Sequence, residues 1–355
     1  MKINLNALQK TKVKPFCRSG ITKEEYDNFV NESGDTFPFV LTDDWLCIIT
    51  SETKGKEKYY FITSISSEFT VSKCNYNIVT NIRSYTICAK VNGDEIEFEV
   101  NAETLTVLGL KELLKRGILY DERMAKELQR YVMISAYKAE KQAVHTTLGW
   151  NGQLFLSSKS YPDTKHPSKY IGCIDFCPKG SKETYLDMIK SQVVKYIPLL
   201  FIWIVGFCSI ILAYLNKYFD FGCLIFALNN LSSKGKTTAA MLSTSITSNP
   251  VFDKGLITNF SGTANAILNF VSQSNAHTVV LDEAGTAETL QSRKLLYQVC
   301  SGRDRKRLNT SGELKETAEY NSAIIVTGEY SIIDSAAPNG IRARIFEITD
   351  DLTVS

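Results

Sequence analysis

The first part of the chain alternates short hydrophobic and polar runs. This pattern extends from Thr42 to Val100 and predicts antiparallel strands with one buried face. The run WLCIIT, the turn TKGKEK and the run YYFITSI predict one hairpin. A second hairpin is predicted where Asn92-Gly93 separates YTICAKV from DEIEFEV, because two-residue hairpin turns favour Asn-Gly.

Helical spacing follows these hairpins. Leucines recur at helical spacing from Glu103 to Arg116, and Asp121 is the expected cap of a second helix that reaches about Lys141. A short strand pair is predicted around GWNGQLFL. The loop from Ser157 to Ser181, rich in Ser, Pro and Lys, is the predicted domain boundary.

Beyond this loop, long helical patterns alternate with continuous apolar runs, namely CLIFAL, TVVL, AIIVT and RIFEI. Such runs are typical of central strands covered on both faces, so they predict a mostly parallel α/β sheet between helices. We therefore expect a basic polar arm over residues 1–40, a smaller mixed α+β domain over 41–180 and a three-layer α/β domain over 181–355.

One apolar segment allows two interpretations. Ile197 to Leu215 carries no charge over 19 residues and lies between Lys195 and Lys217, which is long enough for a membrane span. A core helix packed against the sheet is favoured, because Pro198 and Gly206 shorten the unbroken helical run. The strand and loop that follow would also have to lie in water.

The amino-acid composition indicates the cellular compartment of the protein but says little about its function. The 355 residues, 44% of them hydrophobic, suit two globular domains, and a net charge of +2 leaves nucleic-acid contact to local patches. Nine scattered cysteines predict free thiols in a reducing cytoplasm, with no cysteine–histidine metal site. The N-terminus lacks the apolar core of a signal peptide, so export is not expected. Its six early Lys or Arg residues suit a solvated tail or contact with a phosphate backbone.

A phosphate-binding loop is predicted where CLIFAL leads into a helix. The stretch NLSSKGKTT, residues 230–238, fits the pattern G-x-x-x-x-G-K-[ST] except that Asn230 stands at the first glycine, where its tolerance of positive φ is expected to substitute. Backbone amides would surround the phosphates at the helix N-terminus, Lys236 would bridge the β- and γ-phosphates of ATP, and the Thr237 hydroxyl would hold Mg²⁺. The predicted nucleotide-binding residues are Asn230, Ser232, Ser233, Lys234, Gly235, Lys236, Thr237 and Thr238.

Acidic residues complete the predicted site. The strand in AHTVVLDEAGT ends in Asp282 and Glu283, 46 residues after Lys236. Asp282 would hold Mg²⁺ through its water shell, and Glu283 would polarise the attacking water. Either motif alone also occurs as an ordinary turn or strand end, but both in order favour an ATP site. The next strand ends in Thr327, a candidate contact for the γ-phosphate or the water, with Glu329 as a further polar candidate.

Two basic segments follow. SGRDRKRLNTSGELKETAEY predicts a hairpin that is either solvated or turned toward nucleic acid or a neighbouring subunit's phosphates. Its candidate residues are Arg303, Arg305, Lys306 and Arg307. Arg342 and Arg344 lie two apart, hence on one side of a strand or loop, and either is a surface arginine or a finger for a neighbouring subunit's γ-phosphate. Arg344 is the preferred finger.

The order of these motifs resembles the bacterial domain-of-unknown-function family 927, P-loop ATPases carried by phages and other mobile elements. The resemblance covers roughly Thr42 to Asp350 and rests on S-x-KGKTT, VVLDE-x-G, R-x-RKR, VTGE and G-IRARIFEI. It implies an AAA+-type P-loop ATPase domain similar to that of minichromosome-maintenance helicases, which have a hairpin before the third strand. It also implies a role for the 303–315 hairpin. Two departures are Asn230 and a chain that stops soon after the arginine strand, where such helicases continue.

The leading hypothesis is a cytoplasmic ATPase that uses Mg²⁺, assembles as a homo-oligomeric ring and translocates along or unwinds single-stranded or forked DNA. The resemblance adds a mobile element as its setting and a primase or other replication protein as a candidate partner. An ATP-dependent switch or defence ATPase acting on a protein partner is the alternative. A membrane-associated ATPase using residues 197–215 is a third hypothesis, although a membrane partner is not expected.

Overall fold

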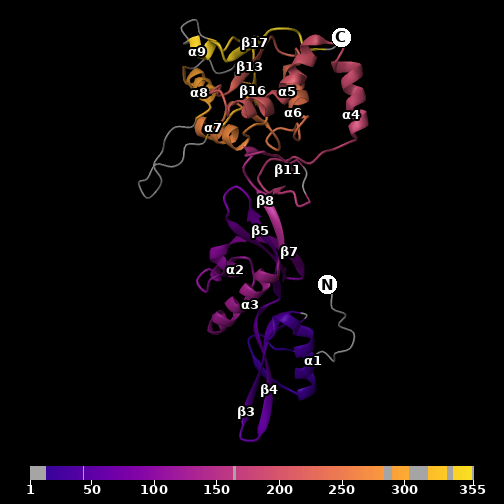
Figure 1. Ribbon diagram of the computed structural model, residues 1–355, viewed down its shortest axis with the longest axis vertical. Coiled ribbons are helices and arrows are strands. Elements are labelled where there is room, and N and C mark those ends of the chain that lie inside the picture. Colours follow the sequence, from indigo (N-terminus) through magenta and orange to yellow (C-terminus); the bar gives the residue numbers. More distant parts are fainter. Residues whose placement is uncertain are drawn as a thin grey trace. The chain divides into compact units, whose positions relative to one another are not determined.

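The computed structural model describes residues 13–42, 44–162, 165–283, 290–303, 319–333 and 339–353. The chain divides into two compact units, Met1–Val144 (unit 1) and His145–Ser355 (unit 2). Figure 1 shows the elements of each unit.

Unit 1 is a mixed α+β structure with two sheets. One sheet has the order β1-β4-β3-β2, and in the other the strands β8-β5-β6-β7 are neighbours, with β5 and β8 parallel. Helix α3 packs on β5 over a buried apolar core. The elements are β1 (Arg18–Ile21), α1 (Lys23–Ser33), η1 (Gly34–Thr36), β2 (Phe39–Leu41), β3 (Trp45–Lys54), β4 (Glu57–Ser67), β5 (Phe69–Asn77), β6 (Arg83–Val91), β7 (Asp94–Asn101), η2 (Ala102–Leu105), α2 (Lys111–Lys115), η3 (Glu122–Met124), α3 (Ala125–Lys138) and β8 (Glu140–His145).

Both predicted hairpins are present. Strands β3 and β4 pair up to Lys54 and Glu57, and β6 and β7 pair up to a turn at Asn92-Gly93 with φ values of 53° and 91°. The predicted helix from Glu103 to Arg116 is wrong, because the chain forms η2, a turn and then the short α2. The Thr106 hydroxyl accepts the Gly109 N–H and donates to the carbonyl of Glu103, which stabilises the turn.

The segment predicted as a basic arm is folded where it is described. Strand β1 pairs with β4, and α1 begins with a capping box in which Thr22 and Glu25 satisfy each other's backbone N–H groups. Residues 18–33 are therefore part of unit 1. The capping pair and the strand pairing outweigh the polar composition from which an arm was predicted.

Unit 2 is built on a parallel sheet of order β14-β15-β16-β13-β17. The predicted parallel α/β sheet is confirmed, and β14 is a strand that the sequence pattern missed. The elements are β9 (Gly149–Asn151), β10 (Leu154–Leu156), β11 (Ser160–Tyr161), β12 (Lys169–Tyr170), α4 (Lys182–Met188), η4 (Ile189–Val193), α5 (Ile197–Leu215), β13 (Leu224–Asn229), α6 (Lys236–Thr244), β14 (Ile257–Asn259), α7 (Ala264–Gln273), β15 (Val279–Asp282), α8 (Leu290–Cys300), β16 (Ala323–Gly328), α9 (Asn339–Arg342) and β17 (Ile345–Ile348).

Alternate side chains of the central strands enter different cores. In β13, Ile225 and Ala227 pack with α7 and α8, whereas Phe226 and Leu228 pack with α5 and α6. The same alternation holds in β15 and β16. Helices thus cover both faces of the sheet, which explains why these strands are apolar without interruption.

Residues 145–180, placed in the N-terminal domain by the sequence analysis, belong to the compact unit of the parallel sheet. Leu148 and Ile174 enter the core beneath α7 and α8, and the Trp150 indole donates to the Ile210 carbonyl at 3.0 Å. Burial of these apolar side chains fixes the segment to unit 2. A polar loop therefore did not mark the boundary, which falls after Val144.

Two buried histidines join the same segment to the turn before β15. His145 contacts Ser157 and Ser168 through its two ring nitrogens, and the Ser157 hydroxyl contacts Nε2 of His277 at 2.9 Å. Burial lowers the pKa of both histidines, that of His277 to about 4. Both rings are therefore neutral in the folded protein at neutral pH.

We expect this network to make unit 2 acid-sensitive. The folded-state pKa of His277 lies below the ordinary 6.5, so the unfolded chain binds more protons between about pH 6.5 and 4, and stability falls as the pH falls through that window. The free energy of unfolding is expected to fall by about 3 kcal/mol through the protonation of His277. Denaturant unfolding of the wild type and His277→Gln over this range measures it, with the exposed His166→Gln as control. Equal pH slopes in wild type and His277→Gln would contradict the assignment.

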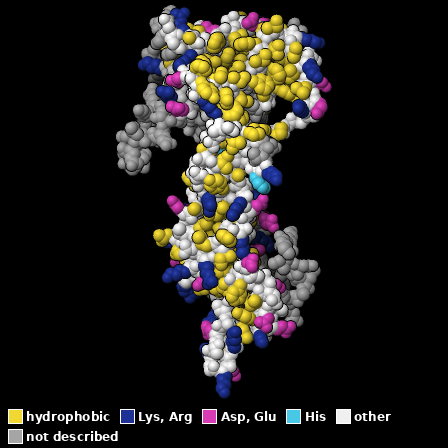
Figure 2. Space-filling model, viewed as in Figure 1, with side chains coloured by type: hydrophobic (Ala, Val, Ile, Leu, Met, Phe, Trp, Pro, Cys, Tyr) yellow, Lys and Arg dark blue, Asp and Glu magenta, His cyan; other side chains and the backbone are white. Residues whose placement is uncertain are grey.

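Helix α5 is amphipathic in its packing although not in its composition. Leu199, Ile202 and Val205 are buried against α6 and the sheet, whereas Ile197 and Ile211 are exposed by 77% and 58%. Figure 2 shows hydrophobic side chains gathered over the part of unit 2 where Figure 1 labels α5. Helix α5 packs against the sheet as predicted, but its outer apolar face is exposed. Among the described residues, α5 is the one helix long and apolar enough to cross a membrane, and about a third of it is buried.

Close approach of α5 and α6 requires glycine at 206. A Cβ there would lie 2.5 Å from the Ser243 carbonyl oxygen and would also meet Ile246. We expect Gly206→Ala to lower the free energy of unfolding by about 1–3 kcal/mol, as overpacking does. Gly340→Ala, in α9 with open space around the added methyl, is the control and is expected to be neutral or stabilising. Equal denaturation midpoints of Gly206→Ala and wild type would refute this packing role.

Candidate nucleotide site

The candidate site lies at the carboxyl edge of the parallel sheet. Strands β13, β14, β15 and β16 all end at this edge, because they run in the same direction. Open α/β sheets bind ligands at this edge. A pocket of about 790 Å³ is present there, a volume typical of small-molecule sites. Its lining residues are Ser232, Ser233, Lys234, Gly235, Lys236, Thr237, Thr238, Asp282, Glu283, Thr327, Gly328, Glu329 and Tyr330.

The loop between β13 and α6 has the conformation of a phosphate-binding turn. Ser233 and Gly235 have positive φ values of 63° and 77°, and α6 begins directly at Lys236. The backbone amides at the start of α6 therefore adjoin the pocket, where a helix N-terminus favours an anion. The Lys236 ammonium donates to the carbonyls of Asn230 and Leu231 at 2.6 and 2.7 Å.

Asn230 does not act as the sequence predicts. It is not among the residues with positive φ, and it does not line the pocket. Its side-chain amide instead donates to the carbonyls of Thr349 and Asp350, both at 3.0 Å. The left-handed backbone that the substitution was expected to provide is located at Ser233 and Gly235.

Two threonine hydroxyls converge on Asp282. Thr237 Oγ1 lies 3.2 Å from Asp282 Oδ1, and the Thr327 hydroxyl donates to the same oxygen. Asp282 is 5% exposed. A hydroxyl beside a carboxylate fits Mg²⁺, a hard cation that takes oxygen ligands from one or two carboxylates and otherwise from substrate phosphates and water. Within the described part of the chain, no cluster of three or more His, Cys, Asp or Glu forms a protein-only metal cage.

Glu283 lies at the end of β15 in an unusual backbone conformation. Its φ is 62°, and its N–H donates to Thr327 Oγ1 at 3.0 Å. Its carboxylate accepts a hydrogen bond of 2.7 Å from Asn259, the last residue of β14. A positive φ in a non-glycine residue costs energy and often marks a functional site. Asn259 was missed because β14 is only three residues long and carries no strong strand pattern.

Arg342 and Arg344, the two candidate arginine fingers, are in different environments. Arg342 ends α9 and is exposed, whereas Arg344 precedes β17 and donates to the backbone carbonyls of Cys300 and Asp220 at 3.2 and 3.5 Å. Arg342 is part of a helix, so the two arginines do not share one strand or loop as predicted. The described contacts therefore hold Arg344, the finger preferred from the sequence, against backbone carbonyls of its own chain and leave Arg342 exposed.

The basic segment is described only at its two ends. Arg303 forms a bridge with Glu319 and ion pairs with Glu319 and Asp220, at 3.5 and 3.4 Å. Arg305, Lys306 and Arg307 lie outside the described residues. The antiparallel bridge agrees with the base of a hairpin, and the role of the segment stays a prediction.

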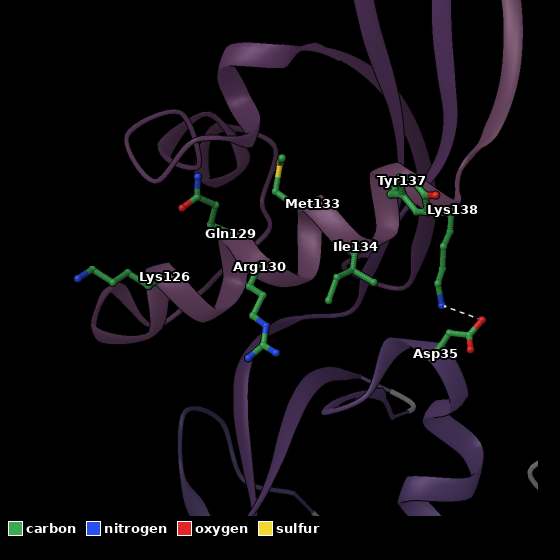
Figure 3. A pocket seen from close by; sticks show the side chains of 8 residues that line it. All are labelled: Asp35, Lys126, Gln129, Arg130, Met133, Ile134, Tyr137 and Lys138. Atoms are coloured by element: carbon green, nitrogen blue, oxygen red, sulfur yellow. Dashed lines mark ion pairs between the residues drawn. The ribbon is translucent and has the colours of Figure 1, made fainter.

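A second hollow lies in unit 1 along the exposed side of α3 (Figure 3). It has a volume of about 600 Å³, and Lys138 contacts Asp35 at 3.5 Å across it. Lys126 and Arg130 contribute charge, and Met133 and Tyr137 contribute exposed apolar surface. The eight lining residues include no nucleophile beside a base and no pair of carboxylates.

The chain shares its fold with a helicase of known structure. It is similar to a solved structure described as "SCCmec type IV Cch - active helicase", with a TM-score of 0.66 and 23% sequence identity. The alignment covers 90% of this chain and 59% of that one, so the chain spans about three fifths of the helicase's length. Curated proteins give no match. The fold of this chain is therefore the mixed α/β fold of that helicase.

A family model identifies the protein family to which the chain belongs. The model of the family described as "Domain of unknown function (DUF927)" matches residues 42–319, which is most of the chain. The chain belongs to this family, and the resemblance predicted from the motifs is confirmed.

Proposed function

We propose that this chain is an AAA+-type ATPase that hydrolyses ATP with Mg²⁺ in the pocket at the carboxyl edge of the parallel sheet and acts on DNA. The observation that carries the proposal is the 3.2 Å contact of Thr237 with Asp282, beside a loop that opens a helix with Lys236. Hydroxyl, carboxylate, lysine and helix N-terminus are the groups that phosphoryl transfer requires. The strand order, with β13 between β16 and β17, supports the AAA+ assignment.

Binding uses the loop and α6. The amides of residues 232–236 surround the phosphates, and Lys236 exchanges its contacts with two loop carbonyls for the β- and γ-phosphate oxygens. Thr237 and Asp282 are the residues that would hold Mg²⁺. When bound, Mg²⁺ supplies neutralisation of the phosphate charge.

Turnover uses the ends of β15 and β16. Glu283 orients the attacking water and accepts its proton once its carboxylate leaves the Asn259 amide. Thr327 contacts both Asp282 and the Glu283 N–H, so it fixes the two acidic residues relative to each other. Glu329 lines the same pocket and is a second polar group within the site.

The proposal also includes assembly into a ring and DNA as the partner. The exposed Arg342 is proposed to reach the γ-phosphate in a neighbouring subunit of a ring, which stabilises the charge that develops in transfer. DNA is proposed as the partner because the fold is shared with a helicase and the segment after Arg303 carries clustered Arg and Lys.

The test is ATP hydrolysis with and without single-stranded DNA, over a range of protein and salt concentrations. A ring motor is expected to show turnover that rises with DNA, more than linearly with protein, and falls steeply with salt. Nucleotide binding without DNA stimulation would contradict the motor and favour an ATP-dependent switch acting on a protein partner.

A further inference from the structure

The segment after β17 lies against the candidate phosphate loop. We call residues Thr349–Thr353 the strap, and we propose that the strap holds the loop in its binding conformation through Asn230, which acts as a positioning residue. The inference rests on the proposed function, because it assigns a role in nucleotide binding to a residue outside the pocket.

Three hydrogen bonds hold the Asn230 side chain. Its Nδ2 donates to the carbonyls of Thr349 and Asp350 at 3.0 Å each, and its Oδ1 accepts the Leu231 N–H at 2.7 Å. Two carbonyls require the amide nitrogen and one N–H requires the amide oxygen, so these contacts specify one orientation of the amide. Glycine, the usual residue here in phosphate loops, has none of these contacts.

The strap is attached to the loop at a second place. The Leu352 N–H donates to the Lys234 carbonyl at 3.1 Å, and the Lys234 ammonium pairs with the Asp351 carboxylate at 2.7 Å. Hydrogen bonds from Lys234 and then from Thr353 hold the pKa of Asp351 well below its usual range. The pair is about two-fifths exposed, so it contributes little energy on its own. Its effect is to fix the position of the strap.

The strap is also anchored away from the loop. The Leu352 side chain is 4% exposed and packs in the core with α6, and the Tyr196 hydroxyl donates to the Asp351 carbonyl. A Cβ at Gly235 would lie 2.9 Å from the Leu352 carbonyl oxygen. The loop and the strap are therefore in direct backbone contact, which glycine permits.

Asn230 connects the strap to the reacting part of the loop. While its side chain holds the strap, its carbonyl accepts the Lys236 ammonium at 2.6 Å. A loop fixed in this way loses less conformational freedom when a nucleotide binds, which raises affinity. Asn230 thus compensates for the missing glycine by tying the loop to the strap.

The test compares Asn230→Ala and Asn230→Gly with wild type in ATP titrations, steady-state kinetics and thermal unfolding. Removing the side chain is expected to raise Kd and KM for ATP about tenfold in both variants, the loss of about two neutral hydrogen bonds. The expected kcat stays within about threefold and Tm within a few degrees. Binding by Asn230→Gly as tight as wild type would overturn the inference, because it would make Asn230 a mere replacement for glycine.

A second measurement separates the two proposals and does not depend on a variant. ATP is expected to slow hydrogen exchange at the Leu352 amide in the wild-type chain, because the strap and the loop are ordered together. ATP binding without this protection overturns the strap alone. No ATP binding by wild type overturns the proposed function itself, and the inference with it.

Discussion

Replacing Lys236 by alanine is expected to weaken ATP binding about 100-fold or more. The ammonium is held by two loop carbonyls at 2.6 and 2.7 Å, beside the pocket in which the phosphates are proposed to bind. It would form at least two charge-assisted hydrogen bonds with the phosphates, each worth about 1.5–3 kcal/mol. Titration with a fluorescent ATP analogue in the presence of Mg²⁺ measures the change.

The control is Lys190→Ala, an exposed lysine outside the pocket that pairs with the exposed Asp187. It is expected to change the affinity by no more than about threefold, because an exposed ion pair contributes about 0–1 kcal/mol. Equal losses in both variants would show that general positive charge, and not the position of Lys236, governs binding.

Replacing Glu283 by glutamine is expected to abolish turnover while ATP still binds. The amide keeps the size of the side chain but cannot accept the proton of the attacking water, so kcat falls by about 10²–10⁴-fold. The Kd for ATP stays within about threefold, because Glu283 is not proposed to contact the nucleotide. Phosphate release and ATP titration on the same preparation separate the two effects.

Glu329→Gln is the control for the assignment of the base. Glu329 lines the same pocket from the end of the neighbouring strand. Turnover in this variant is expected to remain within about threefold of wild type. If Glu329→Gln stopped hydrolysis and Glu283→Gln did not, the base would be Glu329.

The sequence was most informative where local chemistry and strand pattern coincide. The Asn92-Gly93 turn and the continuous apolar runs of β13, β15 and β16 predicted hairpin and sheet correctly, because turn geometry and two-sided burial act on adjacent residues. Since parallel strands end at one edge, the positions of Lys236, Thr237 and Asp282 along the chain were enough to expect them around one pocket.

Features that depend on contacts distant in sequence were not predicted. Asn259 contacts Glu283 from a three-residue strand, and the strap contacts a loop more than a hundred residues earlier. The predicted helix from residue 103 failed because the turn around Thr106 outweighs helical leucine spacing. The domain boundary failed because burial of Leu148 and Ile174 is not visible in a polar loop.

Mg²⁺-dependent phosphate release from ATP by the full chain, measured beside Lys236→Ala, is the direct test of the proposed ATPase activity. The wild type is expected to release phosphate, and the release is expected to disappear when Mg²⁺ is removed and in Lys236→Ala. Equal release by both proteins, or no release by a wild type that binds ATP, would contradict the proposed activity.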